Sequence, residues 1–257
     1  MTRPAEDVLE RREFKYLVPR QLVPRLRGAL EFACVPDRNA GPDGTYRVRS
    51  LYLDTPQYDL FHANAREAPE RFKARIRCYP SRSSPVFLEI KKRVLDTIVK
   101  TRAALPSESW KAIVERMVPA VDESSESRGA HAREQFFALV HTHHLRPVLL
   151  VEYVREAYTS TIDPYARATF DTRVVCQAKR AFDLEADPRH WRTVAHPGRT
   201  VTEPAYVVLE LKFGSTAPAW MVAMVRRFDL LRHSFSKYGY SLRAELALPS
   251  SRVSATG

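Results

Sequence analysis

The chain has 257 residues, enough for one large domain or two small ones with a real hydrophobic core. Apolar residues make up 44% of the sequence, which excludes an intrinsically disordered protein. The formal net charge of +11 favours an anionic partner, such as a nucleotide, polyphosphate, nucleic acid or an acidic membrane surface, and does not choose among these.

Strand patterns dominate the chain, with helical patterns between them. In chain order the sequence predicts a strand (13–18), a helix (20–33), a strand (45–54), a hairpin (70–79 and 85–94), a helix (106–118), a helix ending near 144, three strands (147–158, 165–176 and 205–213), a helix from 216 and a last strand (237–246). Residues 122–129 read as a polar loop. The strands show no alternating βαβ rhythm, which favours an antiparallel barrel or sandwich of the α+β class.

The cysteines and the apolar runs indicate a cellular compartment. Cys34, Cys78 and Cys176 form no CxxC pair and suggest no disulfide framework. The first seven residues lack the apolar stretch of a secretory signal, and no run reaches the roughly 18 apolar residues that span a bilayer. We therefore expect a soluble, cytoplasmic protein.

The stretch Arg71–Tyr79 carries the clearest functional pattern. Its odd-numbered residues are basic up to Arg77, including Lys73 and Arg75, whereas its even-numbered residues are apolar. Because side chains alternate across a strand, four cations project from one face of this strand. Such a face is either the solvated outer side of a sheet or a surface that binds an anion.

Other predicted strands repeat this pattern. The same alternation places together Glu13 with Lys15, Glu89 with Lys91 and Arg93, Tyr153 with Arg155, Arg167 with Asp171, and Glu210 with Lys212. Like charges on neighbouring strands repel, so a face this rich in cations needs water or a bound anion. If the apolar faces turn outward under the amphipathic helices, the sheet closes into a tunnel with charged walls. Arginine and lysine side chains suit phosphate oxygens, which makes a phosphate polyanion the expected ligand.

Motifs that hold phosphate through the backbone are missing. The sequence has no GxxxxGK[ST] loop and no GxGxxG, and it contains 8 glycines in all. It also has no HExxH motif. The cluster of His141, His143 and His144 falls at an expected helix end, where surface or capping histidines are more common than a metal site. Phosphate is therefore expected to be bound by side chains.

The sequence resembles the catalytic VTC (vacuolar transporter chaperone) domain of polyphosphate polymerases, within the triphosphate tunnel metalloenzyme superfamily. The resemblance covers residues 10–246 and rests on eight short motifs in order: Glu13–Tyr16, Ser50–Thr55, Arg75–Arg77, Leu88–Lys91, Tyr153–Arg155, Arg167–Thr172, Leu209–Lys212 and Phe235–Tyr238. It implies a closed tunnel of eight antiparallel strands with helices packed outside. The expected domain spans residues 10–248, between tails at 1–9 and 249–257.

The resemblance also implies roles for individual residues. Matched position by position, the residues expected to contact phosphates are Lys15, Arg75, Arg77, Lys91, Arg155, Arg167, Ser236 and Lys237. Tyr153 would lie beside the nucleotide or its phosphates, and Glu210 would bind Mn²⁺ or Mg²⁺. Lys73, Lys212, Glu13 and Glu89 share the charged faces and are further candidates for substrate binding.

Two departures from the family pattern bear on the chemistry. Hydrolytic relatives carry ExExK or ExExE on the opening strand, whereas here Arg11 replaces the first glutamate before Glu13 and Lys15. A carboxylate-rich site for two metal ions is therefore less expected. Fungal polymerases also carry a regulatory domain and membrane helices that are missing here, which leaves a membrane partner open.

The expected function is synthesis of polyphosphate from ATP with a divalent metal ion. The alternatives are a metal-dependent triphosphatase or tripolyphosphatase, to which Glu13 and Glu89 could supply metal ligands, and a non-catalytic module that binds polyphosphate or RNA. RNA is the least expected ligand, because stacking on bases needs aromatic residues among the basic ones, and opposite the basic row of Arg71–Arg77 the sequence offers Phe72 alone.

Overall fold

The computed structural model describes residues 12–80, 84–95, 97–118, 128–163, 165–194 and 206–246. These residues form two compact units, each assembled from separate stretches of the chain. The first unit comprises residues 1–45, 156–171 and 204–234, and the second comprises residues 46–155, 172–203 and 235–257. The sequence showed no domain boundary because neither unit is continuous along the chain.

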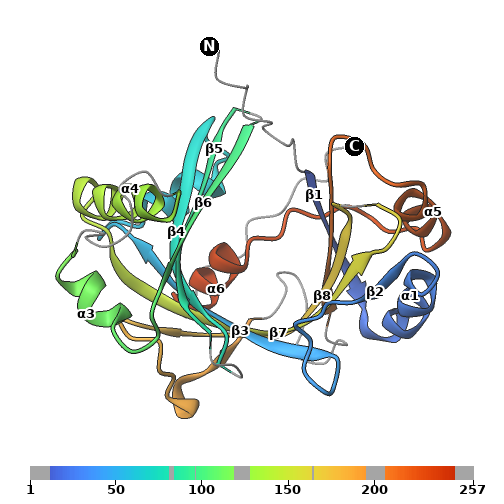
Figure 1. The fold of residues 1–257 in the computed structure, drawn as a ribbon, viewed down its shortest axis with the longest axis horizontal. Helices are drawn as coiled ribbons and strands as arrows, with labels where there is room; N and C mark the ends of the chain where they lie inside the picture. The colour runs from blue at the N-terminus through green and yellow to red at the C-terminus, as the bar shows by residue number, and fades with distance from the viewer. Residues whose placement is uncertain are drawn as a thin grey trace. The chain divides into compact units, whose positions relative to one another are not determined.

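The described residues form strands and helices over most of their length (Figure 1). The strands are β1 (Arg12–Pro19), β2 (Cys34–Pro36), β3 (Thr45–Asp54), β4 (Glu70–Cys78), β5 (Val86–Val94), β6 (Thr97–Leu105), β7 (Arg146–Ser160), β8 (Arg167–Ala178), β9 (Arg192–Thr193) and β10 (Tyr206–Phe213). The α-helices are α1 (Val23–Leu30), α2 (Asp59–Ala65), α3 (Trp110–Glu115), α4 (Arg128–Thr142), α5 (Ala219–Arg227) and α6 (Lys237–Glu245), and the 3₁₀ helices are η1 (Arg20–Leu22) and η2 (Pro188–His190).

The strands form an antiparallel sheet, which confirms the predicted α+β class. Hydrogen-bonded neighbours follow the order β1-β10-β8-β7-β3-β4-β5-β6, with β2 paired to β7 and β9 paired to β8. Eight strands therefore lie on the main path. No helix in the described part of the chain is long and apolar enough to cross a membrane.

In the second unit, alternation along β4 and β5 separates an apolar face from a charged one. Ile76 and Leu88 are cross-strand partners and fully buried, and they pack with Phe136 and Val140 of α4. Burial of these side chains stabilises the sheet by about 1.5–3 kcal/mol each. Figure 1 shows α4 beside these strands, so this helix covers the apolar face, as expected.

In the first unit, β1 and β10 follow the same rule. Tyr16 pairs with Leu209, and both are buried against Leu26 of α1 and Met221 of α5. The intervening residues, including Glu210, lie on the other face. The apolar faces of both units are therefore covered by helices, as the sequence indicated.

The segment from Lys237 is a helix, so the predicted last strand is wrong. Ser236 caps α6 by accepting a hydrogen bond from the backbone N–H of Gly239. Tyr238 and Leu242 of this helix pack with Tyr52 and Tyr153, whose side chains belong to the sheet. Tyr52 is the cross-strand partner of Arg75, so α6 lies on the face of the sheet that carries the charges. The expectation that the helices pack on the other, apolar face therefore does not hold for α6.

Three other expectations change. The predicted helix 106–118 is limited to α3, and the residues just before Pro106 form β6, a strand that the sequence analysis missed. The polar loop 122–129 overlaps the start of α4 at Arg128, and its earlier residues lie outside the described part. Arg11 and the predicted tails, 1–9 and 249–257, also lie outside it, and the proposed domain limits stay predictions.

Candidate phosphate-binding site

The second unit carries a charged face on three successive strands. We call it the cationic face and define it by Lys73, Arg75 and Arg77 of β4, Glu89 and Lys91 of β5, and Lys100 and Arg102 of β6. The strand register aligns these residues in rows: Arg75, Glu89 and Arg102 are opposite one another, as are Lys73, Lys91 and Lys100. Six cations and one carboxylate therefore share one surface of about two strand spacings in width.

Glu89 is the buried centre of the cationic face. Its side chain is 2% exposed, and one carboxylate oxygen lies 2.7 Å from Arg75 and 3.7 Å from Arg77. The other oxygen lies 3.1 Å from Lys100 and 3.5 Å from Arg102. Burial by itself would raise the pKa of Glu89, but the arginines and Lys100 outweigh it and hold this pKa far below its usual range, so Glu89 is ionised.

Two side chains of β3, which pairs with β4 on the edge opposite β5, accept hydrogen bonds from the arginines. Arg75 donates a hydrogen bond of 3.1 Å to the hydroxyl of Tyr52, and Arg77 donates one of 3.2 Å to the hydroxyl of Ser50. Burial would raise the pKa of Tyr52, but the positive charges of Arg75 and Arg77 lower it. Both guanidinium groups are thus fixed between a hydroxyl on one strand and a carboxylate on another.

The start of α6 adds two predicted phosphate contacts beside this face. The Nζ of Lys73 donates to the hydroxyl of Ser236 at 2.9 Å. The next residue, Lys237, is 8% exposed, and its ammonium lies 4.8 Å from the ring centroid of Tyr153. The guanidinium of Arg155 lies 5.3 Å from the same ring. Lys237 and Arg155 therefore both lie against the ring of Tyr153, beside the cationic face.

A buried hydrogen bond fixes the position of α6. The hydroxyl of Tyr238 donates to Asp54, whose carboxylate also accepts three backbone N–H bonds, from Thr55, Leu60 and Phe61. The ring of Tyr238 stacks on Tyr52 at a centroid distance of 4.9 Å. Because Tyr238 directly follows Lys237, this contact determines where the Lys237 ammonium lies.

The first unit carries a smaller charged group on β1, β8 and β10. Lys15 and Glu210 are cross-strand partners, as are Glu13 and Lys212, and Arg167 is opposite Lys212 on the other side. The Nζ of Lys15 lies 3.1 Å from Glu13 and 4.0 Å from Glu210, and the Nζ of Lys212 lies 3.0 Å from Glu210. Glu210 is buried, whereas Arg167 is exposed.

Glu210 and a neighbouring hydroxyl are suited to a hard divalent cation. Thr169 is the cross-strand partner of Glu210, and its buried hydroxyl has no hydrogen-bond partner within the described residues. Carboxylate and hydroxyl oxygens are the donors that Mg²⁺ and Mn²⁺ accept. No group of three or more His, Cys, Asp and Glu residues in the described ranges could hold a metal by protein ligands alone.

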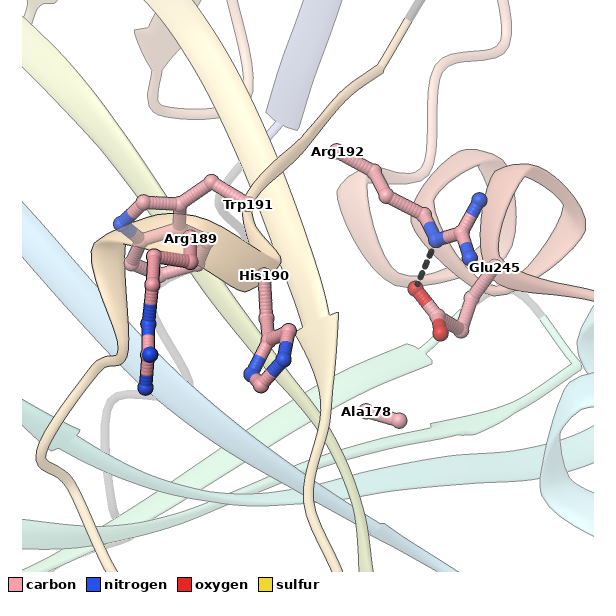
Figure 2. A pocket seen from close by; sticks show the side chains of 6 residues that line it. All are labelled: Ala178, Arg189, His190, Trp191, Arg192 and Glu245. Carbon is pink, nitrogen blue, oxygen red and sulfur yellow. Dashed lines mark ion pairs between the residues drawn. The ribbon is translucent and has the colours of Figure 1, made fainter.

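A separate pocket of about 360 Å³ lies at the other end of α6 (Figure 2). Its lining residues are Ala178, Arg189, His190, Trp191, Arg192 and Glu245. Its cations have carboxylate partners: Arg192 lies 3.2 Å from Glu245, as the dashed line in Figure 2 marks, and Arg189 donates to Asp187 at 2.8 Å. We do not assign this pocket to phosphate binding, because its charges are already balanced.

The structure divides the fourteen predicted site residues between the units. Nine lie in the second unit on or beside the cationic face, and Glu13, Lys15, Arg167, Glu210 and Lys212 lie in the first. The sequence analysis missed Lys100 and Arg102, because it did not recognise β6. It also missed Tyr52 and Thr169. Lys100 and Arg102 share one parity in a run rich in the β-branched residues Thr97, Ile98, Val99 and Thr101, a signal that could have found the strand and its two cations.

Comparison with known proteins gives the family. The sequence model of the VTC domain matches residues 10–245. The chain belongs to the VTC domain family. Among curated proteins, none matches the sequence. We use the family name for the domain below.

Two solved structures resemble the VTC domain. A crystal structure of a candidate adenylate cyclase from Bacillus halodurans has a TM-score of 0.51 and 14% identity, and the match covers 89% of this chain and 94% of that one. A candidate adenylate cyclase from Vibrio parahaemolyticus has a TM-score of 0.47 and 11% identity, with 90% and 97% covered. The first likeness supports the antiparallel α+β fold.

Proposed function

We propose that this VTC domain is a polyphosphate polymerase that transfers the γ-phosphate of ATP to a growing polyphosphate chain. Family membership supports a phosphoryl-transfer protein of the triphosphate tunnel type. The observation that carries the proposal is the cationic face, on which arginine and lysine side chains are fixed in rows around Glu89. Rows of fixed cations suit a linear chain of phosphates better than a single compact anion.

Phosphoryl transfer depends on alignment and on neutralisation of charge more than on covalent chemistry. Arg75 and Arg77 present guanidinium groups that are already oriented by Tyr52, Ser50 and Glu89, so little reorganisation is needed when charge moves during transfer. An acceptor phosphate is ionised at neutral pH, which removes the need for a general base. Lys73, Lys91 and Lys100 form the next row and would hold the following phosphate of the chain.

A divalent metal ion, Mn²⁺ or Mg²⁺, is part of the proposal. Glu210 and Thr169 would hold it, and when bound it would neutralise charge on phosphate oxygens. Lys15 and Lys212 lie 4.0 and 3.0 Å from the Glu210 carboxylate. We also propose, from the family resemblance, that the eight strands of the main path close into a tunnel.

Hydrolysis of tripolyphosphate is the second candidate activity. It was expected to use Glu13 and Glu89 as additional metal ligands. Glu89, however, lies within 2.7–3.7 Å of four cationic side chains, which repel a divalent cation from its carboxylate. The four cations around Glu89, against two beside Glu210, favour transfer over two-metal hydrolysis.

Incubation of the protein with ATP and Mn²⁺ tests the proposal. We expect long-chain polyphosphate, detected by gel electrophoresis, together with ADP. Orthophosphate without polymer would contradict the polymerase and support the triphosphatase. Neither product, combined with tight binding of tripolyphosphate, would support a non-catalytic polyphosphate-binding module.

Two adjacent lysines of β5 provide a matched pair of variants. Lys91 lies on the cationic face, whereas Lys92 lies on the opposite face and pairs with Glu70 at 2.6 Å. We expect Lys91→Ala to weaken tripolyphosphate binding by about tenfold, the loss of roughly one charge-assisted contact, and Lys92→Ala to leave it unchanged. Equal effects of the two variants would show that net charge, and not the cationic face, determines binding.

A further inference from the structure

Glu89 holds cations of both neighbouring strands at once. One of its oxygens is directed to Arg75 and Arg77 on β4, and the other to Lys100 and Arg102 on β6. The register explains the arrangement, because Arg75, Glu89 and Arg102 are direct cross-strand partners. No other carboxylate is within 4.0 Å of these four cations among the ion pairs of the described residues.

The head groups have little freedom once Glu89 is in place. The Nε and a terminal nitrogen of Arg75 both lie 2.7 Å from one Glu89 oxygen, which fixes the plane of the guanidinium. The guanidinium of Arg102 stacks on Phe87 at 3.5 Å from the ring centroid while its Nε faces Glu89. Without Glu89, four positive charges on neighbouring strands would repel one another and separate.

The same carboxylate also opposes the binding of phosphate. A phosphate that approaches Arg75 or Lys100 meets a cation already paired with an anion. Part of the attraction between each cation and a ligand is therefore cancelled, by an amount that depends on the distance to Glu89. Glu89, a single buried carboxylate, therefore both orients these cations and weakens their attraction for phosphate.

We propose that Glu89 is a positioning residue that acts through Arg75, Arg77, Lys100 and Arg102, orienting them for phosphoryl transfer while weakening their hold on the phosphate chain. The proposal deepens the polymerase assignment and rests on it for the transfer step. It replaces the earlier expectation that Glu89 contacts the substrate or a metal ion. A weakened hold allows each phosphate to move to the next row as the chain grows.

Glu89→Gln tests both parts of the proposal in the full-length protein. Inorganic tripolyphosphate binding is measured by calorimetry at about pH 6, where Lys100 with its pKa of about 8 is protonated, without ATP or metal, and turnover is measured with ATP and Mn²⁺. We expect Kd for tripolyphosphate to fall about tenfold, as loss of one nearby negative charge implies, while kcat falls about tenfold or more. Tighter binding with slower transfer is a combination that a general structural defect does not produce.

Two further variants complete the design. Glu89→Asp keeps the charge but is too short to reach both strands, so we expect near wild-type tripolyphosphate binding with reduced kcat. Glu70→Gln removes a carboxylate from the opposite face of the same strand pair, where it pairs with Lys92. We expect Glu70→Gln to change neither quantity. If circular dichroism shows that Glu89→Gln does not fold, Glu89→Asp tests the proposal instead: kcat should fall while tripolyphosphate binding stays near the wild-type value.

Three outcomes would overturn the proposal. Weaker tripolyphosphate binding in Glu89→Gln would mean that Glu89 supports binding. Unchanged kcat in both Glu89 variants would mean that it does not orient the cations. If Glu70→Gln tightened tripolyphosphate binding as much as Glu89→Gln, the change in affinity would be an effect of net charge and not of the position of Glu89. A wild-type protein that makes no polymer defeats the polymerase assignment separately, because the tripolyphosphate measurements do not depend on that activity.

Discussion

Replacement of Tyr238 by phenylalanine is the sharpest test of how α6 is held. The change removes one hydroxyl, which donates to the fully buried carboxylate of Asp54, and it keeps the ring that stacks on Tyr52. Asp54 retains its three backbone donors, so the loss is one hydrogen bond to an acidic group. Such a bond contributes about 1.5–3 kcal/mol to the free energy of unfolding.

We therefore expect Tyr238→Phe to destabilise the protein by about 2 kcal/mol, which lowers the melting temperature of a chain of this size by about 4–8 °C. Thermal melting followed by circular dichroism measures this. Tyr79→Phe is the matched control, because Tyr79 lies in the same unit and its hydroxyl makes no hydrogen bond among the described residues. We expect the control to melt within about 1 °C of the wild type, a shift below the usual effect of a surface substitution.

The variant also has a functional consequence. Ser236 and Lys237 directly precede Tyr238, so looser docking of α6 displaces both from the cationic face. At 25 °C a domain with ordinary stability remains folded after a loss of about 2 kcal/mol, and turnover should nevertheless fall. A melting temperature equal to that of Tyr79→Phe would refute the reasoning, since the Asp54 contact would then contribute nothing.

Two further predictions concern charge and metal binding. Burial lowers the pKa of Lys100 to about 8; the charge of Glu89 raises this pKa, whereas the charges of Arg75 and Arg77 lower it. The Lys100 ammonium therefore loses its proton as the pH rises through 8, and tripolyphosphate affinity should fall over the same range. Lys100→Arg keeps its charge and should abolish that fall; a calorimetric pH series that shows the same fall in the variant would contradict this assignment. Thr169→Val should leave the melting temperature nearly unchanged, because its hydroxyl has no partner in the described part of the chain, but should raise the Mn²⁺ concentration needed for half-maximal turnover. An unchanged Mn²⁺ titration would remove Thr169 from the proposed metal site.

The sequence predicted the strands that carry strict alternation. Arg75 and Ile76 were assigned to opposite faces from parity alone, and the structure confirms this, because Ile76 lies in the apolar core while Arg75 pairs with Glu89. Parity fixes the face of every residue in a strand once one face is apolar. It could not show which carboxylate meets which cation, because that depends on the register between strands.

The segment from Lys237 shows where alternation misleads. Tyr238 and Leu242 have the same parity and read as one face of a strand, but they are also four residues apart and share one face of a helix. Ser236, followed three residues later by Gly239, provides the cap that favours the helix. The hydroxyl of Ser236 thus decides the local structure, a signal that hydrophobic periodicity does not contain.

The meander of β4, β5 and β6 also has a consequence for the order of folding. Each of these strands pairs with the next strand along the chain, whereas β1 and β10, which also pair, are separated by most of the sequence. Contacts between nearby residues form faster than contacts that must close a long loop. We therefore expect the meander to assemble first, at a stage when its arginines and lysines have met no phosphate. Glu89 belongs to the same meander, so the chain supplies its own anion to those cations during assembly and does not depend on a ligand to fold.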